Sequence, residues 1–164
     1  MDIAIGTCSV KIVMLGRCPL RVTSTLCRRP YPGHAKGCPN YGMRLSCPPQ
    51  AQLYTALVDT SRPVTALWAR LNFHKYLQEM KLKHPTWSDR QLRNPLYWQG
   101  TVRSHLLHYW QSYRLGVPST WFFTLIPEAH GVHVFKTMKT GGLVLEKKPT
   151  YYVYKVALVG PRCK

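Results

Sequence analysis

The segment from Arg17 to Pro49 most restricts what this chain can fold into, because it is rich in cysteine, proline, glycine and arginine and poor in periodic apolar residues. Proline fixes φ and lacks an N–H donor, so we expect the prolines of this segment to exclude long regular elements. A loop of that length needs an organiser, and a bound metal can supply one. The prolines are Pro19, Pro30, Pro32, Pro39, Pro48 and Pro49.

Five of the six cysteines lie in the first 47 residues of the chain. A disulfide framework would normally staple a whole domain, so clustering at one end favours a local metal site. The predicted ligands are Cys27, Cys38 and Cys47, and the last two are followed directly by proline. Proline after a ligand removes a competing N–H donor, and a Cys-Pro end also occurs in ferredoxin-type ligand runs.

The intervals between these cysteines favour an iron–sulfur cluster, of the 4Fe-4S type, over zinc. Zinc sites usually contain close Cys-x2–4-Cys pairs, and this segment has none. Three cysteines can hold a four-iron cluster with one iron left open, and Cys18 or His34 is a candidate further ligand. Zinc in a Cys3His site with His34 is one alternative. The other is no metal, with the thiols acting as small buried hydrophobes.

The predicted site lies among basic residues that could offset the negative charge of a cluster, namely Arg28, Arg29, Lys36 and Arg44. Tyr41, His34 and Arg44 are further candidates for holding thiolates or a substrate.

The chain as a whole carries 23 Lys and Arg against six Asp and Glu, a formal net charge of +17. Such a field attracts polyanions, so nucleic acid is a candidate partner, although the basic residues form no single run. No stretch approaches the roughly 18–20 continuous apolar residues that cross a bilayer. The N-terminus only weakly imitates a secretory signal. We therefore expect an intracellular, cytoplasmic protein without a membrane partner.

The remaining residues predict a single small domain of the α/β or α+β class, with a few strands flanked by helices and the Cys/Pro-rich metal-binding loop near the N-terminus. Residues 1–16 are expected to form a strand or an extension, and 17–164 the metal-binding domain with its Cys-rich loop at 17–49. Alternation and β-branched content predict strands, apolar spacing predicts helices, and Ser88 with Gln91 predicts a capping box. The expected strands are 3–5, 10–14, 64–73 and 151–159. Helices are expected to begin near residues 73, 89 and 98, and a further helix is expected over 128–139.

Two motifs resemble a known family. Cys38-Pro-Asn-Tyr-Gly-(x)4-Cys47-Pro-Pro resembles the signature of a family of uncharacterised, predicted metal-binding proteins with a domain of unknown function. Glu128 to Thr137 resembles the Glu-Ala-x-Gly-(Ile/Val)-(Asp/Asn)-Val-(x)2-Thr segment of the same family, so the resemblance spans about 17–160. The stretches 31–49 and 87–103 are similar to a small subgroup of hypothetical proteins. The resemblance implies a metal site, iron–sulfur in type, at the three predicted cysteines, and it implies no established reaction.

The sequence departs from that family in two places. Larger members have additional cysteines just before the Glu-Ala-x-Gly segment, where residues 122–127 have none. Subgroup members often have a cysteine near Asn94, a residue that is a poor substitute for a thiolate. The fourth ligand position is thus open to Cys18, Cys8, His34, water or a substrate.

Overall fold

Within residues 1–30 and 34–163, the part of the chain that the computed structural model describes, four strands form one antiparallel sheet in the order β1-β2-β4-β3. β2 and β4 lie in the centre and pair along most of their length, while β3 is a short strand at the edge. The strands are β1 (Ile3–Val10), β2 (Val64–Asn72), β3 (Phe122–Thr124) and β4 (Tyr152–Gly160).

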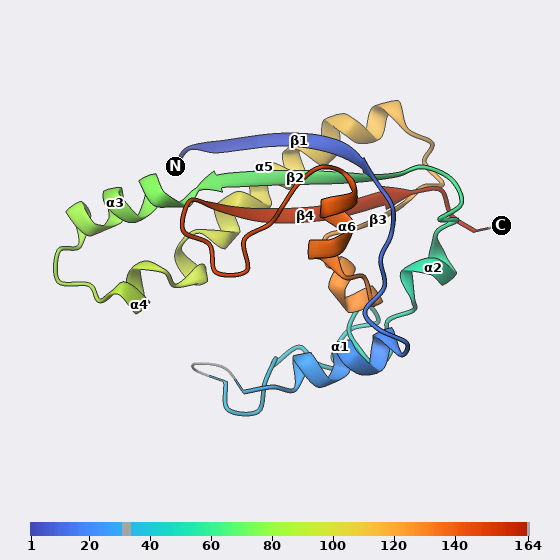
Figure 1. Cartoon of the computed structure of the whole chain (residues 1–164), viewed down its shortest axis with the longest axis horizontal. Coiled ribbons are helices and arrows are strands. Elements are labelled where there is room, and N and C mark those ends of the chain that lie inside the picture. The colour runs from blue at the N-terminus through green and yellow to red at the C-terminus, as the bar shows by residue number, and fades with distance from the viewer. Residues whose placement is uncertain (31–33, 164) are drawn as a thin grey trace.

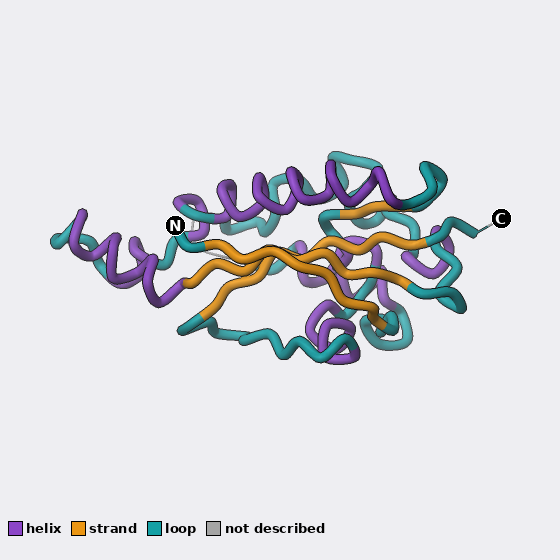
Figure 2. The backbone as a smooth tube through the Cα atoms, turned by 90° about the horizontal axis from the view of Figure 1, so that it is seen from above, coloured by secondary structure: helices purple, strands orange, loops and turns teal. Residues whose placement is uncertain are grey.

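Helices cover both faces of this sheet, which explains why its central strands are apolar nearly throughout (Figures 1 and 2). Successive side chains of a strand point to opposite faces. Ala66 of β2 therefore joins one buried cluster and Leu67 joins the other. The helices α2 (Tyr54–Leu57) and α6 (Val134–Thr140) contribute to the first cluster, and α3 (Phe73–Lys83) and α5 (Gln99–Tyr113) contribute to the second.

This architecture confirms the predicted fold class, and it is specifically α+β. The predicted strand at 64–73 is β2, and the apolar stripe that begins at Trp98 belongs to α5, where Val102 and Leu106 are buried. The strand predicted at 151–159 is β4, which occupies a central position.

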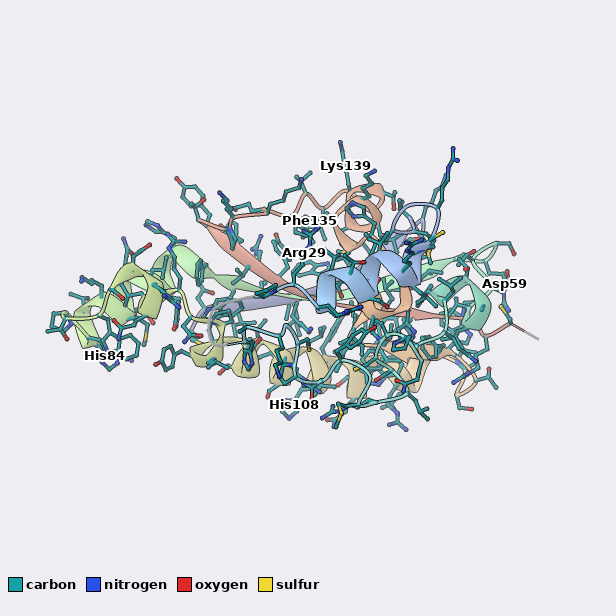
Figure 3. All side chains as sticks on the ribbon, turned by 90° about the horizontal axis from the view of Figure 1, so that it is seen from below. Arg29, Asp59, His84, His108, Phe135 and Lys139 are labelled. Carbon is teal, nitrogen blue, oxygen red and sulfur yellow. The ribbon has the colours of Figure 1, made fainter. Side chains whose placement is uncertain are left out.

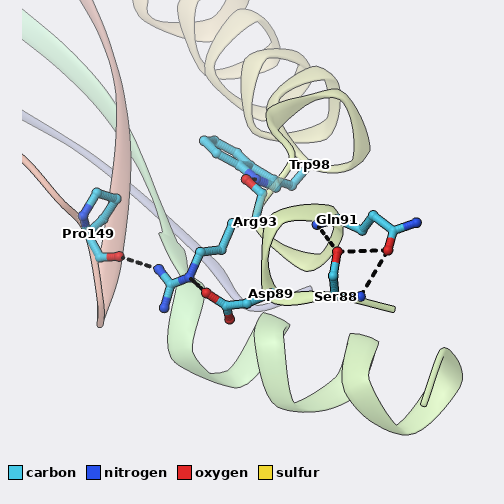
Figure 4. A network of polar contacts seen from close by, with 6 residues as sticks. All are labelled: Ser88, Asp89, Gln91, Arg93, Trp98 and Pro149. Carbon is cyan, nitrogen blue, oxygen red and sulfur yellow. Dashed lines mark hydrogen bonds and ion pairs between the residues drawn. The ribbon is translucent and has the colours of Figure 1, made fainter. Parts of the chain in front are cut away.

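The predicted capping box is present at the start of α4 (Asp89–Leu92), where the side chains and backbone amides of Ser88 and Gln91 bond reciprocally (Figure 4). Arg93 then fixes the end of this helix. It forms an ion pair of 2.9 Å with Asp89 and donates a bond of 3.1 Å to the carbonyl oxygen of Pro149, which leads into β4 (Figure 4). The pair of helices α3 and α4, which projects from one end of the sheet in Figure 1, is thereby joined back to the domain.

Of the two short strands expected near the N-terminus, the run 3–5 lies in β1, which continues to Val10. The strand expected at 10–14 is wrong beyond Val10, and Met14 forms an isolated bridge with Val132. Gly6 and Trp68 are directly opposite in the β1–β2 register, and the indole ring occupies the space where a Cβ of Gly6 would lie. A glycine inside a strand often marks such a close approach. Gly6 therefore continues β1 where the sequence suggested an interruption.

The prediction that prolines exclude regular structure throughout 17–49 is wrong at its start. Residues Pro19–Cys27 form helix α1. The missing N–H of a proline costs nothing at the first helical position, so Pro19 begins this helix. The short strand β3 was not predicted.

The single helix predicted at 128–139 is also wrong. A 3-10 helix, η3 (Pro127–His130), comes first and α6 starts only at Val134. Gly131 separates them with a left-handed φ of 80°, and a Cβ there would collide with Pro19 of α1.

Residues 31–33 of the motif loop, which include the start of the stretch similar to the subgroup, lie outside the described residues. None of the helices in the described part of the chain is both long and apolar enough to cross a membrane.

Candidate functional site

A cavity of about 640 Å³ lies between the Cys-rich segment and the rest of the domain. One wall is made by α1 and the loop that follows it, and the other by α5, η3 and the start of α6. In Figure 1, α1 and this loop run below the sheet. Figure 3 views the molecule from that side, with Arg29 just beyond the end of α1 and Phe135 on α6. Small-molecule and cofactor sites commonly measure roughly 300–1,000 Å³, so the cavity is of ordinary size for a ligand.

The three predicted metal ligands line this same cavity. Cys27 is the last residue of α1, and Cys38 and Cys47 come from the loop. The N–H of Cys38 donates a hydrogen bond of 2.7 Å to the carbonyl oxygen of Cys27. Gly37 makes this approach possible, because its φ is 84° and a Cβ would lie 2.5 Å from that same oxygen.

A second set of bonds shapes the loop around Cys47. The N–H of Gly42 donates to the carbonyl oxygen of Pro48 at 3.0 Å, and the side chain of Gln50 donates to the carbonyl oxygen of Gly42 at 3.1 Å. The carbonyl oxygen of Cys47 accepts from the N–H of Ala51 at 2.9 Å. This segment therefore closes on itself and returns Cys47 to the cavity.

The thiols influence one another electrostatically. Burial raises the pKa of Cys27, and the neighbouring Cys38 and Cys47 raise it further because a second thiolate repels the first. All six cysteines are free thiols.

The donor set fits a metal centre in kind, since three thiols line one cavity whose surface is mainly apolar. The three thiols lie further apart than the ligands of a bound metal ion do. No three His, Cys, Asp or Glu residues lie close enough to hold a metal ion, among residues 1–30 and 34–163. Binding would require the thiols to close in on the metal, as expected where metal binding and folding are coupled.

The other candidate ligands lie elsewhere. Cys18 is exposed at the start of α1, and neither it nor the exposed His34 is among the described residues that line the cavity. Cys8 lies in β1 beside Gly141. Asn94 caps the 3-10 helix η1 (Pro95–Tyr97) by accepting from the N–H of Leu96. Of the four basic residues expected around a cluster, Arg44 lines the cavity, while Arg28, Arg29 and Lys36 are exposed outside its described lining.

The opposite wall is fastened to α1 by Thr23, which is buried. Its hydroxyl lies 3.0 Å from the carbonyl oxygens of both Glu128 and Pro19, as a donor. The N–H of Leu15 also donates to the carbonyl oxygen of Gly131 at 2.8 Å. The segment that resembles the second family motif thus forms the far side of the cysteine cavity.

Glu128 supplies the carboxylate of this wall. Glu128 is exposed by its accessible area, yet the protein atoms around its carboxyl group desolvate it, and this desolvation raises its pKa. Lys155 of β4 acts in the opposite direction by favouring the charged carboxylate. Burial lowers the pKa of Lys155 itself, Glu128 raises it, and Arg103 of α5 lowers it.

Sequence reasoning did not single out Arg103, which lines the cavity wall. Arg103 is one of 23 basic residues, and no motif distinguishes it from the others. His133, which also lines the cavity, caps the start of α6, where its Nδ1 accepts from the N–H of Lys136 at 3.4 Å. Its neighbour His130 is buried and bonds the carbonyl oxygen of Gln52, 2.9 Å away, so the two histidines have separate surroundings.

Comparison of the chain with family models, with curated proteins and with solved structures gave no match.

Proposed function

We propose that this chain is a metal-binding protein in which Cys27, Cys38 and Cys47 hold an iron–sulfur cluster of the 4Fe-4S type, used in redox chemistry or in a small cluster-dependent enzyme. The observation that carries the proposal is that these three cysteines, separated by ten and eight residues of a loop, line one cavity. The backbone hydrogen bond from Cys38 to Cys27 supports it, because this bond brings the first two ligands together independently of any bound metal.

The count of three cysteines in the lining also supports an open coordination position. A cluster held by three thiolates would supply either one-electron transfer or an iron free to act as a Lewis acid. The chain's own contribution would be to set an apolar wall beside the cluster and to place Arg44, Arg103 and Glu128 around the cavity.

Purification without oxygen, followed by a visible spectrum and by assays of iron, sulfide and zinc, tests this proposal. We expect broad visible absorption and equal amounts of iron and acid-labile sulfide. Serine substitutions of Cys27, Cys38 and Cys47 should each remove most of both. Cys8→Ser and Cys163→Ser are matched controls, because these cysteines lie outside the cavity lining, and they should leave the content unchanged.

The alternative metal is zinc, and the same assays separate the two. One zinc per chain without sulfide, lost in the same three variants, would make the centre a zinc site. Metal content that does not depend on Cys38 would refute a centre at these cysteines altogether.

A second candidate function is nucleic-acid binding, favoured by the charge of the chain. Lys and Arg outnumber Asp and Glu by 23 to six. In the part of the chain that the structure describes, Arg93 and Asp89 form the one ion pair, so most of this positive charge faces solvent unpaired. Affinity for a short DNA or RNA duplex should fall steeply as salt rises, because counterions are released on binding. Absence of binding at low salt would remove this candidate.

A further inference from the structure

Each wall of the cysteine cavity carries a guanidinium group that forms no ion pair with a carboxylate of residues 1–30 and 34–163. Arg44 comes from the loop between Cys38 and Cys47, and Arg103 comes from α5 on the opposite side. Both side chains are exposed. The ion pair found among the described residues involves neither of them, so no carboxylate neutralises these two charges by direct contact.

The carboxylate in the described lining, Glu128, does not balance these two cations. It has a cation of its own nearby, because Lys155 favours its charged form. Arg103 and Lys155 also repel each other, as the lowered pKa of Lys155 partly reflects. The cavity and its immediate surroundings therefore carry an excess of positive charge.

The rest of the lining is largely apolar. Leu15, Leu26, Ile126, Val132 and Phe135 contribute side chains from five different segments. A ligand that matches this surface combines an apolar body with a negatively charged group, since guanidinium groups bind carboxylates and phosphates in paired hydrogen bonds.

We propose that this cavity binds a small organic acid, a molecule in which a carboxylate or phosphate group is joined to an apolar body, with Arg44 and Arg103 holding the acidic group. Such an acid is the class of molecule on which the metal centre would act, and in that respect the acid site rests on the proposed function. Its own support is the placement of the two guanidinium groups and the apolar wall, which does not involve the thiols.

Calorimetric titration of the full chain, purified without oxygen and with its metal content measured, tests this inference. The probes are phenylacetate, phenyl phosphate and the uncharged phenylacetamide. We expect at least one acid to bind with a dissociation constant of about 1 mM or lower, and the amide to bind at least about tenfold more weakly. The acid that binds more tightly identifies the preferred acidic group.

Arg44→Gln and Arg103→Gln should each weaken binding of the acids by about tenfold or more, since hydrogen bonds to charged groups are among the stronger ones. Arg114→Gln, at the end of α5 and outside the cavity lining, is the matched control and should change nothing. Circular dichroism establishes that each variant is folded.

The outcomes separate the two proposals. Preferential binding of acids by a protein without metal would support the acid site and count against the metal centre. Two results would overturn the acid site alone if metal is present at the three cysteines. One is that the amide binds as well as the acids, and the other is that no acid binds at about 10 mM. Glutamine variants that lose metal and keep their acid affinity would overturn it too, because the guanidinium groups would then serve the metal centre.

Discussion

The N–H of Cys38 donates a hydrogen bond of 2.7 Å to the carbonyl oxygen of Cys27, which fastens the motif loop to the end of α1 at two of the three candidate ligands. The bond depends on Gly37, the residue that precedes Cys38. Gly37 lies against the Cys27–Arg28 peptide with a φ of 84°, so the backbone there leaves no room for a side chain.

Replacing Gly37 should therefore disturb the loop more than replacing a similar glycine nearby. Gly37→Ala adds a clash with backbone to the cost of a left-handed conformation, and we expect a loss of at least about 2 kcal/mol in the free energy of unfolding. Gly42→Ala is the control, since its φ is 71° but its Cβ would meet open space, and it should cost about 1 kcal/mol. Urea titration measures both. Equal costs would show that the close approach of Gly37 to Cys27 adds nothing to stability.

Thr23 should stabilise the junction between α1 and η3 through its hydroxyl. Thr23→Val keeps the shape of the side chain but leaves the carbonyl oxygens of Pro19 and Glu128 without this donor, which should cost about 1–2 kcal/mol. Thr25→Val is a matched control two residues later, because Thr25 is exposed and bonds only the carbonyl of Arg21 within its own helix. Thermal or urea unfolding of the two variants should differ clearly, and a similar loss in both would contradict the role given to Thr23.

Glu128 should make the protein less stable as the pH rises. Its pKa is raised in the folded state by desolvation, so the folded chain holds this proton more tightly than the unfolded chain does. The corresponding stability is present below the ordinary value of 4.5 and is lost as the pH rises through the folded pKa. As the pH increases above 4.5, the unfolding free energy of Glu128→Gln should therefore rise relative to that of the natural chain.

Glu146 provides a comparison of opposite sign. Hydrogen bonds from Thr150, first its N–H, lower the pKa of Glu146, so its stabilising effect is present above the ordinary value of 4.5 and is lost as the pH falls through the folded pKa. The loss of unfolding free energy in Glu146→Gln, relative to the natural chain, should be largest above pH 4.5 and should become smaller in acid. Parallel pH profiles for the two variants would contradict both assignments.

Gly6 should stabilise the pairing of β1 with β2, because it leaves room for Trp68. Gly6→Ala would drive a methyl group into the indole ring of Trp68, and we expect a loss of about 1–3 kcal/mol in unfolding free energy. Gly100→Ala near the start of α5 is the control, because its Cβ would meet open space and alanine is the better helix former by about 0.5–1 kcal/mol. The two alanine variants should thus shift the melting temperature in opposite directions.

Periodic segments could be predicted from the sequence because their pattern and their tertiary environment agree. β2 is apolar on both faces and is buried on both, and the apolar stripe of α5 faces the second buried cluster. The capping residues Ser88 and Gln91 act within four residues of each other, so their role needed no knowledge of distant contacts.

Predictions failed where a distant contact decided the local structure. The break at Gly131 exists because η3 must approach Pro19 of α1, a residue far away in the chain. The failure at Pro19 has a local cause instead, because a proline tolerated at the first helical position can begin a helix as well as end one. The position of Arg103 opposite the cysteines follows from how α5 crosses the sheet, which no pattern within α5 encodes. The three candidate ligands, in contrast, were chosen from the spacing and neighbours of the cysteines, and the metal itself remains a prediction.

The pairing of Leu67 in β2 with Ala157 in β4 has a consequence for the order of events during folding. Strands so far apart in the chain meet only after a large loop has closed, a step whose entropy cost slows folding. Ribosomes make α1 and the cysteine loop before η3 and α6, which form the far wall of the cavity and of which η3 contacts β4. We therefore expect the three thiols to be synthesised well before the wall that encloses them, with a long interval in which they remain open to solvent.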